Sequence, residues 1–323
     1  CRSPRQRSAP TIGILRRISR LAGGRTGTVA IVVPRITRWF FGTVVEAVED
    51  LLHQYDYDLL LYNLGGREQT RQRVLQTANL DKRVDALILV ATPLRPVDVA
   101  ALTRLALPGV TISSGSDVPG WPRVRIDDVA AGRTATRHLL DLGHTRIAHI
   151  SGDPDDELAF TTHLDRRRGY QEALRAAGIR PDPSLDVESQ FTIDGGIRAT
   201  AELLARGEPP TAIFAACDEM AMGAMTALRD AGLRVPHDVS VIGIDDHDLA
   251  GVLGLSTVAQ PAAEQGLLAA RLLLDPLGVR AADPYPGLAL RPHDADAGSG
   301  SPPPVILPTR LVVRESTAPP RAH

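Results

Sequence analysis

The stretch AIFAACDEMAMGAMTALRDAGLRVPHDVSVIGI, residues 212–244, decides the fold class. Two short apolar runs, Ala212–Ala215 and Val239–Ile244, flank Glu219–Ala231, whose apolar positions recur at helical spacing. Gly232 follows that segment directly, and glycine is a usual terminator of helices. A strand, a helix and a second strand in this order favour a parallel sheet covered by helices.

The same alternation extends from this stretch toward both ends of the chain. Two successive sets of comparable length predict two similar lobes with the deepest cleft between them, where ligands bind outside the carboxyl ends of the strands. Expected strands are Val29–Val33, Leu59–Tyr62, Ala86–Val90, Val110–Ile112, Val124–Ile126 and Arg146–Ile150, and Val305–Leu307 with Leu311–Val313 supply one last strand. Expected helices cover residues 41–54, 68–80 and 130–142, with a further helix ending at Gly178.

Composition excludes several classes of protein. The 323 residues are 43% hydrophobic and 23% charged, as in an ordinary globular protein and unlike a disordered chain. No apolar run approaches the roughly 20 residues that span a bilayer, which excludes an integral membrane protein. Cys1 and Cys217 cannot make a disulfide framework and fit a reducing cytoplasm. Because the first residue is not methionine, we expect the chain to be a fragment.

Charge is distributed unevenly. Seven of the 36 basic residues are arginines within the first 25 positions, where there is no acid, which leaves 29 basic against 38 acidic side chains elsewhere. A basic arm on an acidic body suggests nucleic acid or a membrane surface as a partner, although a solvated tail is an equal alternative.

Enzyme motifs are absent from the places where chemistry would need them. There is no phosphate loop, no dinucleotide-binding glycine motif and no nucleophile elbow, so we expect no enzyme and no cofactor. The cluster Asp245–Asp248 could ligate a metal, but consecutive residues rarely converge. We therefore expect no metal site: one carboxylate faces the cleft and another caps the following turn.

Two further features point to a pocket for a small polyol. Arg166–Arg168 precede a helix, and one of the three could aim bidentate hydrogen bonds into a cleft while the other two are solvated. Trp39–Phe41 follow the first strand in a chain with only 4% aromatic residues. Such aromatic side chains either belong to the core or stack on a sugar or base ring. The set makes a binding pocket and no catalytic site.

Five stretches together resemble one family. They are GRTGTVAIVVPRITRWFF from Gly24, HLLDLGHTRIAHISG from His138, RRRGYQEALRAAGI from Arg166, AACDEMAMGAMTALRDAGLRVPHDVSVIGIDD from Ala215 and LPTRLVVREST from Leu307. The chain resembles the effector-binding core of the lactose-repressor/galactose-repressor (LacI/GalR) family of bacterial transcription regulators. The resemblance implies an α/β fold of the periplasmic-binding-protein type I, two Rossmann-like lobes joined by three crossovers near Asp127, Gln260 and residues 281–304.

The resemblance also implies a division of the chain. Residues 1–25 form a basic arm and remnant hinge, and residues 283–304 form a flexible insertion. The N-terminal lobe takes residues 26–128 and 261–282, and the C-terminal lobe takes 129–260 and 305–316. Residues 1–20 do not resemble the family's helix-turn-helix, whereas Leu21 stands where the family has the hinge leucine that wedges into the minor groove of DNA.

Ligand contacts carry over position by position. The resemblance assigns effector binding to Phe40, Phe41, Arg166, Phe191 and Asp245, with weaker assignments for Cys217 and Asp218. The family usually has asparagine where this chain has Cys217. A thiol is the weaker donor and acceptor, so a different ligand hydroxyl could be recognised.

These observations predict a cytoplasmic, homodimeric, sugar-responsive transcriptional repressor that is controlled allosterically by a ligand in the interlobe cleft. The implied partners are a sugar or nucleoside-like effector and, for the full-length protein, operator DNA, with no membrane. The alternative is a stand-alone sugar- or solute-binding protein that does not bind DNA.

Three consequences are expected from the sequence. Replacing Arg166 or Asp245 by alanine abolishes effector binding and leaves the fold intact. The surplus of apolar side chains on Glu219–Ala231 packs across a two-fold axis, with the helix after Phe41 contributed by the other lobe. Residues 1–323 alone bind DNA weakly and without sequence preference.

Overall fold

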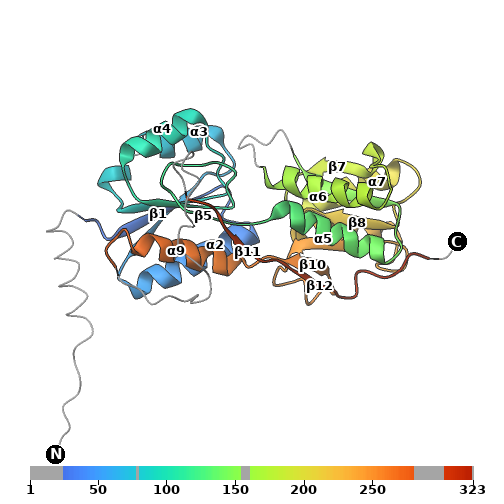
Figure 1. The fold of residues 1–323 in the computed structure, drawn as a ribbon. Helices are drawn as coiled ribbons and strands as arrows, with labels where there is room; N and C mark the ends of the chain where they lie inside the picture. The colour runs from blue at the N-terminus through green and yellow to red at the C-terminus, as the bar shows by residue number, and fades with distance from the viewer. Residues whose placement is uncertain (1–24, 78–79, 154–160, 280–301, 322–323) are drawn as a thin grey trace, which may run out of the picture. The chain divides into compact units, whose positions relative to one another are not determined.

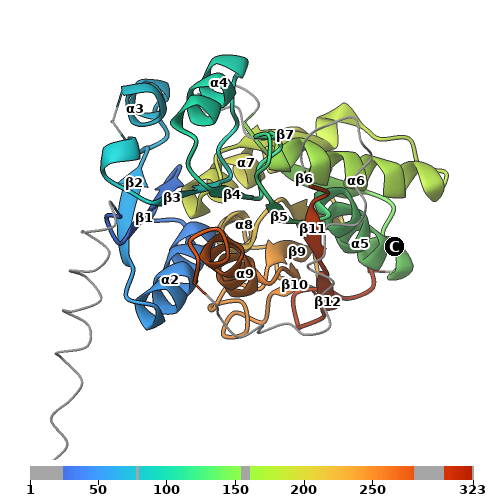
Figure 2. The ribbon, with the colours of Figure 1, turned by 60° about the vertical axis from the view of Figure 1, so that its left-hand side comes forward.

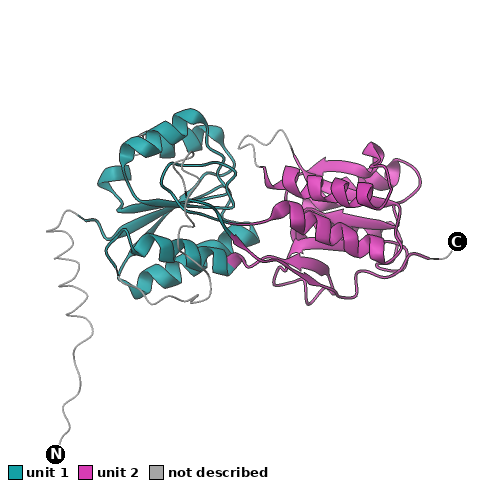
Figure 3. Cartoon of the chain, viewed as in Figure 1, with its two compact units in different colours: residues 1–124, 263–305 teal, residues 125–262, 306–323 magenta. Residues whose placement is uncertain are grey.

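A computed structural model describes residues 25–77, 80–153, 161–279 and 302–321. The chain divides into two compact units, unit 1 (residues 1–124 and 263–305) and unit 2 (residues 125–262 and 306–323), as Figure 3 shows. It therefore passes from one unit to the other three times, at 124–125, 262–263 and 305–306. Leu21, the arm through Arg20 and residues 283–301 of the expected insertion lie outside the described residues.

Unit 1 is built on a sheet in the order β11-β5-β4-β3-β1-β2. Its strands are β1 (Thr28–Val33), β2 (Asp58–Asn63), β3 (Ala86–Val90), β4 (Gly109–Ile112), β5 (Arg123–Ile126) and β11 (Val305–Leu307). Strands β1 to β5 pair in parallel, and β3 and β4 are buried along their whole length, as expected for strands covered on both faces. Helices α3 (Glu68–Gln72) and α4 (Pro96–Leu105) cover one face, and α2 (Trp39–Gln54) and α9 (Ala262–Leu274) cover the other (Figures 1 and 2).

Unit 2 repeats this plan with the order β12-β10-β9-β8-β6-β7. Its strands are β6 (Ile147–Gly152), β7 (Asp186–Ser189), β8 (Ala212–Ala215), β9 (Ser240–Asp245), β10 (Ser256–Ala259) and β12 (Arg310–Val312), and only β12 among these pairs antiparallel, with β10. Along β8, Ala212 and Phe214 face α5 (Asp128–Asp141) and α6 (Thr162–Ala176). Ile213 and Ala215 face α7 (Ile193–Ala205) and α8 (Asp218–Asp230). This alternation of period two puts a separate apolar core on each face.

Most elements expected from the sequence are present within one or two residues, two expected elements differ, and five elements are additional. The helix expected over 68–80 is α3 followed by a π-helical turn, Arg73–Thr77, and a 3₁₀ turn, Leu80–Lys82. The expected last strand is two strands, β11 and β12, which belong to different sheets. Helices α4, α7 and α9 and strands β7 and β10 are additional to the expected set.

The burial of helix α8 differs from the expectation that its surplus of apolar side chains packs across a two-fold axis. Met220, Met222 and Leu228 are buried inside unit 2, and Met225 packs against the same core cluster. The cause is the close approach of α7, where a Cβ on Gly196 would lie 2.1 Å from the Met220 carbonyl oxygen. These apolar side chains of α8 are therefore packed inside unit 2.

Candidate functional site

Charged side chains gather at the carboxyl end of the unit 2 sheet. Asp245 is the last residue of β9, Asp128 is the first residue of α5, and Arg166 lies in the second turn of α6. All three are buried, with Arg166 only 4% exposed. A buried arginine between two buried carboxylates is costly unless its hydrogen bonds are made, so its contacts define the site.

Arg166 is held by two hydrogen bonds. Its Nε donates to Asp128 Oδ1 at 2.9 Å, and its Nη1 donates to the Ala216 carbonyl oxygen at 2.5 Å. The same Nη1 lies 3.9 Å from Asp245 Oδ1. The guanidinium is therefore fixed by Asp128 and the end of β8 while it faces Asp245.

Two glycines make this arrangement possible. A Cβ on Gly132 in α5 would lie 2.3 Å from the Arg166 carbonyl oxygen, and a Cβ on Gly169 in α6 would lie 2.1 Å from the Val129 carbonyl oxygen. The two helix backbones are thus in direct contact next to the ion pair. Only glycine permits this approach, which brings the first residue of α5 to the guanidinium.

Asp245 occupies a strained position. Its φ is 139° and that of Asp246 is 61°, in a region that residues with a Cβ rarely adopt. The Asp245 carboxylate accepts a 2.6 Å hydrogen bond from Gln260 Nε2. Burial raises the pKa of Asp245 to about 7, against the opposing attraction of Arg166. A hydrogen-bonding acid of adjustable charge, held in a fixed orientation, suits recognition of hydroxyl groups.

The residues that follow Asp245 correct one expectation. Asp246 pairs with Arg314, whose Nη2 lies 2.6 Å from the carboxylate. The turn after the strand is capped by His247, whose Nδ1 accepts from the Leu249 amide at 3.0 Å. The cap is therefore an imidazole and not a second carboxylate as the sequence suggested.

Cys217 and Asp218 lie at the N-terminus of helix α8. Asp218 accepts from Thr257 Oγ1 at 2.7 Å and from the His247 amide at 2.9 Å, and burial raises its pKa to about 6. Its contacts tie α8 to the loop after β9. Cys217 is buried at the N-cap of α8, makes no side-chain cap and has a raised pKa because of desolvation. Its thiol is therefore kept neutral.

The three consecutive arginines, Arg166–Arg168, differ in burial, and only one of them points into the site, as the sequence suggested. Arg166 is buried, whereas Arg168 is exposed and pairs with Glu172 at 2.9 Å. Arg167 is intermediate: its Nε lies 2.5 Å from Asp186 and its Nη1 lies 2.9 Å from Glu188. The pairs of Arg167 and Arg168 occupy them with α6 and β7, so Arg166 alone of the three reaches Asp245.

The expected aromatic side chains lie in both units. In unit 2, Phe191 is half-buried, and its ring centroid lies 6.4 Å from that of His163. A Cβ on Gly152, at the end of β6, would lie 2.4 Å from Phe191, so this glycine admits the ring to the carboxyl end of the strand. In unit 1, Phe40 and Phe41 lie in the first turn of α2, half-buried, with their rings edge to face at 5.5 Å.

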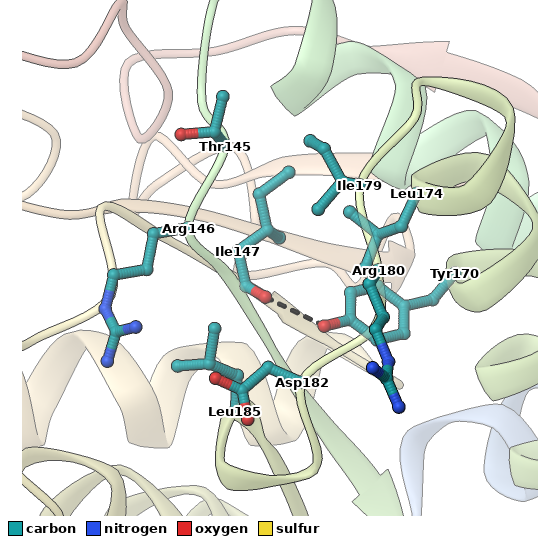
Figure 4. A pocket seen from close by; sticks show the side chains of 9 residues that line it. All are labelled: Thr145, Arg146, Ile147, Tyr170, Leu174, Ile179, Arg180, Asp182 and Leu185. Atoms are coloured by element: carbon teal, nitrogen blue, oxygen red, sulfur yellow. Dashed lines mark hydrogen bonds between the residues drawn. The ribbon is translucent and has the colours of Figure 1, made fainter.

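A cavity of about 210 Å³ opens elsewhere in unit 2, at the start of β6 (Figure 4). Its wall includes Ile147, Leu174 and Tyr170, whose hydroxyl donates to the Ile147 carbonyl oxygen at 2.8 Å. Strand β6 begins here and ends at Gly152, so the cavity is at the opposite edge of the sheet from Asp245. None of the residues predicted to bind effector lines it.

Within the described residues, no group of three or more His, Cys, Asp or Glu side chains is arranged to hold a metal ion. No helix in the part of the chain that the structure describes has the length and apolar content needed to cross a membrane.

Known proteins are similar to this chain in sequence. Residues 136–317 match the family described as "Periplasmic binding protein-like domain". Catabolite control protein A of Priestia megaterium is 34% identical over 255 residues, 78% of this chain and 76% of that protein. The ribose operon repressor of Haemophilus influenzae is 34% identical over 252 residues, 77% of this chain and 74% of that protein.

The chain belongs to the LacI/GalR family of transcriptional regulators. Solved structures of this family superpose on it. The transcriptional regulator CelR in its cellobiose complex has a TM-score of 0.75 at 30% identity and covers 96% of this chain and 92% of its own. A LacI-family regulator from Enterococcus faecium with bound ribose has a TM-score of 0.73 at 31% identity and covers 90% of this chain and 99% of its own. This chain therefore has the periplasmic-binding-protein type I fold.

Two residues at the site of this LacI/GalR regulator were not predicted from the sequence. Asp128 orients Arg166, and Gln260 orients Asp245. The doublet Asp127–Asp128 after a strand was the available signal for the first. Asp127 turns out to be the N-cap of α5, accepting from the Ala130 amide at 2.9 Å, which frees Asp128 to point inward.

Proposed function

We propose that this protein is a repressor whose affinity for operator DNA is set by a small polyhydroxylated effector, a sugar or a nucleoside. The observation that carries the proposal is the buried Arg166, which Asp128 and Ala216 fix so that it faces Asp245. The similarity to the ribose operon repressor, to the CelR–cellobiose complex and to a LacI-family regulator with bound ribose supports this ligand class.

The proposed contact set has polar and aromatic parts. Arg166 and Asp245 hydrogen-bond ligand hydroxyls, and Phe191, Phe40 and Phe41 offer aromatic faces on which an apolar ring face can stack. Asp218 accepts hydrogen bonds from Thr257 and from the His247 amide and so holds the loop after β9, and we expect Asp218 and Cys217 to contribute less to affinity than Arg166 and Asp245.

Control of DNA binding follows from population shift. An effector that binds one arrangement of the two units more tightly increases its population by the ratio of the two affinities. Operator DNA favours one of the same arrangements, so effector and operator change each other's affinity by the same factor. Because the regulator acts on DNA, we place it in the cytoplasm.

Two exposed apolar features support a homodimer. Strand β2 is an edge strand of the unit 1 sheet, its sequence is DLLLYN, and Leu61 is 39% exposed. An unprotected apolar edge strand is rare in a monomer. In unit 2, Leu249, Val252 and Leu253 project from one loop, with Val252 81% exposed. A second copy of the chain would cover both surfaces symmetrically.

Calorimetric titration with a panel of pentoses, hexoses, disaccharides and nucleosides tests the ligand class. We expect one member to bind the wild-type protein and to bind Asp245→Asn about 10- to 100-fold more weakly, because a charged hydrogen bond is lost. Asp248→Asn is the matched control, since Asp248 is an exposed acid three residues further along the same loop. Equal affinity in Asp245→Asn and the control would contradict the proposed site.

The regulatory half of the proposal has its own test. The protein expressed from its complete reading frame is used to select fragments from its own genome, and the effector found above is added to the bound complex. We expect one palindromic site and a change in its affinity when effector is added. Effector binding without any selected DNA would instead favour a stand-alone solute-binding protein.

A further inference from the structure

The cavity at the start of β6 is separate from the candidate effector site (Figure 4). Strand β6 begins at Ile147, in the wall of the cavity, and ends at Gly152, at the edge of the sheet where the charged site lies. The residues that line the cavity all belong to unit 2, so the cavity is complete within one unit. A ligand bound in it would not touch the residues that were predicted to bind effector.

Apolar side chains form the inner wall of this cavity. Ile147, Leu174 and Leu185 are buried, and Ile179 is half-buried. Tyr170 adds its ring, because its hydroxyl already donates to the Ile147 carbonyl oxygen at 2.8 Å and burial raises its pKa, which keeps the phenol neutral. An apolar cavity of about 150 Å³ holds benzene, so a volume of about 210 Å³ has room for one ring and a small substituent.

The loop after α6 forms the lip of the cavity, and hydrogen bonds fix it. Helix α6 is followed by a Schellman motif, in which the Gly178 amide donates to the Arg175 carbonyl oxygen at 3.0 Å. The Ile179 amide donates to the Leu174 carbonyl oxygen at 2.9 Å in the same motif. Asp182 then caps the short 3₁₀ helix that leads to β7. The lip is therefore an ordered part of unit 2.

The open side of the cavity carries an excess of positive charge. The half-buried Arg146 donates from Nη2 to the Glu208 carbonyl oxygen at 2.8 Å, and no acidic side chain of the described residues lies within ion-pair distance of it. Arg180 is exposed and makes no hydrogen bond or ion pair with the part of the chain that the structure describes. The acid among the lining residues is Asp182, whose carboxylate accepts from the Ser184 amide at 2.8 Å, which lowers its pKa. Two arginines and one acid leave one positive charge in excess.

An apolar wall with one excess positive charge at its entrance matches an amphipathic monoanion. Ligand pockets are mostly apolar, with a few polar groups that fix the orientation of the ligand. Guanidinium groups bind the two oxygens of a carboxylate as a pair, and a single excess charge suits a carboxylate better than a doubly charged phosphate.

We propose that this cavity is a second ligand site, which binds a small carboxylate with one compact apolar ring. The ring lies against Tyr170 and the aliphatic wall, and the carboxylate lies at the entrance between Arg146 and Arg180. The proposal does not depend on the identity of the effector, because the two sites share no lining residue.

Benzoate is the probe for this site. Calorimetry at neutral pH and constant ionic strength should show saturable, one-to-one binding to the wild-type protein. The double variant Arg146→Gln/Arg180→Gln should bind at least tenfold more weakly, because charged hydrogen bonds are lost. Arg229→Gln is the control, because the Arg229 side chain is 74% exposed and pairs at 3.5 Å with its neighbour Asp230. Non-saturable binding, unchanged affinity in the double variant or an equal loss in the control overturns the proposal.

A single substitution protects this test against misfolding. Arg146 is bonded to the backbone at Glu208, whereas Arg180 is exposed, so Arg180→Gln should keep the circular dichroism spectrum of the wild-type protein. We expect this variant alone to weaken benzoate binding about two- to fivefold, as for a partly exposed ion pair. An unchanged benzoate affinity in folded Arg180→Gln would remove the arginine from the site.

Two analogues test the ligand class. Benzamide keeps the ring without the charge, and acetate keeps the charge without the ring. Each should bind at least tenfold more weakly than benzoate, because one lacks the charged hydrogen bonds and the other lacks the buried apolar area. Benzamide or acetate that binds as tightly as benzoate would overturn the assignment of an amphipathic carboxylate.

Two further variants locate the bound benzoate. Ile179→Trp places a larger side chain in the wall at a half-buried position, and it should abolish binding while the protein stays folded by circular dichroism. Asp245→Asn should leave benzoate affinity unchanged while it weakens binding of the panel sugars. Persistent binding in folded Ile179→Trp, or a loss in Asp245→Asn, would place benzoate outside this cavity and overturn the proposal.

Discussion

Removing the Arg166 guanidinium tests the centre of the site. We consider Arg166→Met, which keeps the unbranched stem and deletes the charged group. The Asp128 carboxylate and the Ala216 carbonyl oxygen then remain buried without the donors that lie 2.9 Å and 2.5 Å away in the native protein. The sequence alone suggested that replacing Arg166 would leave the fold intact, and from this burial we expect the variant to lose stability.

The expected cost follows from the burial of both partners. Breaking a buried ion pair by removing one member typically costs about 3–5 kcal/mol, because the other charge stays uncompensated. Asp128→Asn in the same protein removes that charge. We therefore expect the double variant Asp128→Asn/Arg166→Met to be about 2 kcal/mol more stable than Arg166→Met alone, so the effects of the two substitutions are not additive, as is usual for residues in contact.

Urea unfolding is the assay, and the chain offers a useful pair of signals. Trp39 and Trp121 are its two tryptophans and both lie in unit 1, so tryptophan fluorescence reports that unit. Far-ultraviolet circular dichroism reports both units, and we expect the loss of stability in this signal. Additive effects of the two substitutions, within about 0.5 kcal/mol, would refute the ion pair and the site that depends on it.

Three other outcomes follow from the structure. The pKa of Asp245 is raised to about 7, so the folded protein binds more protons than the unfolded chain between about pH 4 and 7. The free energy of unfolding should therefore fall as the pH rises through this window. In urea titrations Asp245→Asn should flatten this dependence on pH, and an unchanged dependence would contradict the raised pKa. Gly169→Ala should cost about 1–3 kcal/mol because its Cβ would lie 2.1 Å from the Val129 carbonyl oxygen, whereas Gly251→Ala, with no atom within 4 Å, should be near neutral by the same urea assay. Val252→Asp should shift a dimer toward monomer in sedimentation velocity, and a dimer that persists would exclude this loop from the interface.

The sheet strands were predictable from the sequence because their apolar runs are local signals. Runs such as Val29–Val33 and Ala86–Val90 are covered on both faces, and a strand of that kind shows its burial in its own residues. Helix α7 was missed because Ile193–Ala205 contains two glycines near its start, which weaken a helical pattern. Gly196 is required by packing against α8, since an added Cβ would lie 2.1 Å from the Met220 carbonyl oxygen, and the local pattern does not show this partner.

The charged site was only half predictable for a similar reason. Arg166 and Asp245 follow from motif positions, but Arg166 is fixed by Asp128, 38 residues earlier in the chain. That contact exists because α5 and α6 touch through Gly132 and Gly169. A sequence pattern identifies the residue that binds, whereas its supporting partner depends on a helix contact that only the folded chain defines.

The prediction of a subunit interface on helix α8 failed for the same reason, because it depended on helix contacts within the folded unit. The number of apolar side chains on α8 indicated a partner subunit only on the assumption that unit 2 buries a single face of the helix. Strand β8 and strand β9 cover one side, and α7 approaches so closely at Gly196 and Gly223 that a second side is buried as well. An apolar surplus on a helix is evidence for a partner only after every neighbour in its own unit has been placed. By that criterion we propose that the dimer surface uses side chains that the folded chain leaves exposed, on the edge strand β2 and on the loop that carries Val252.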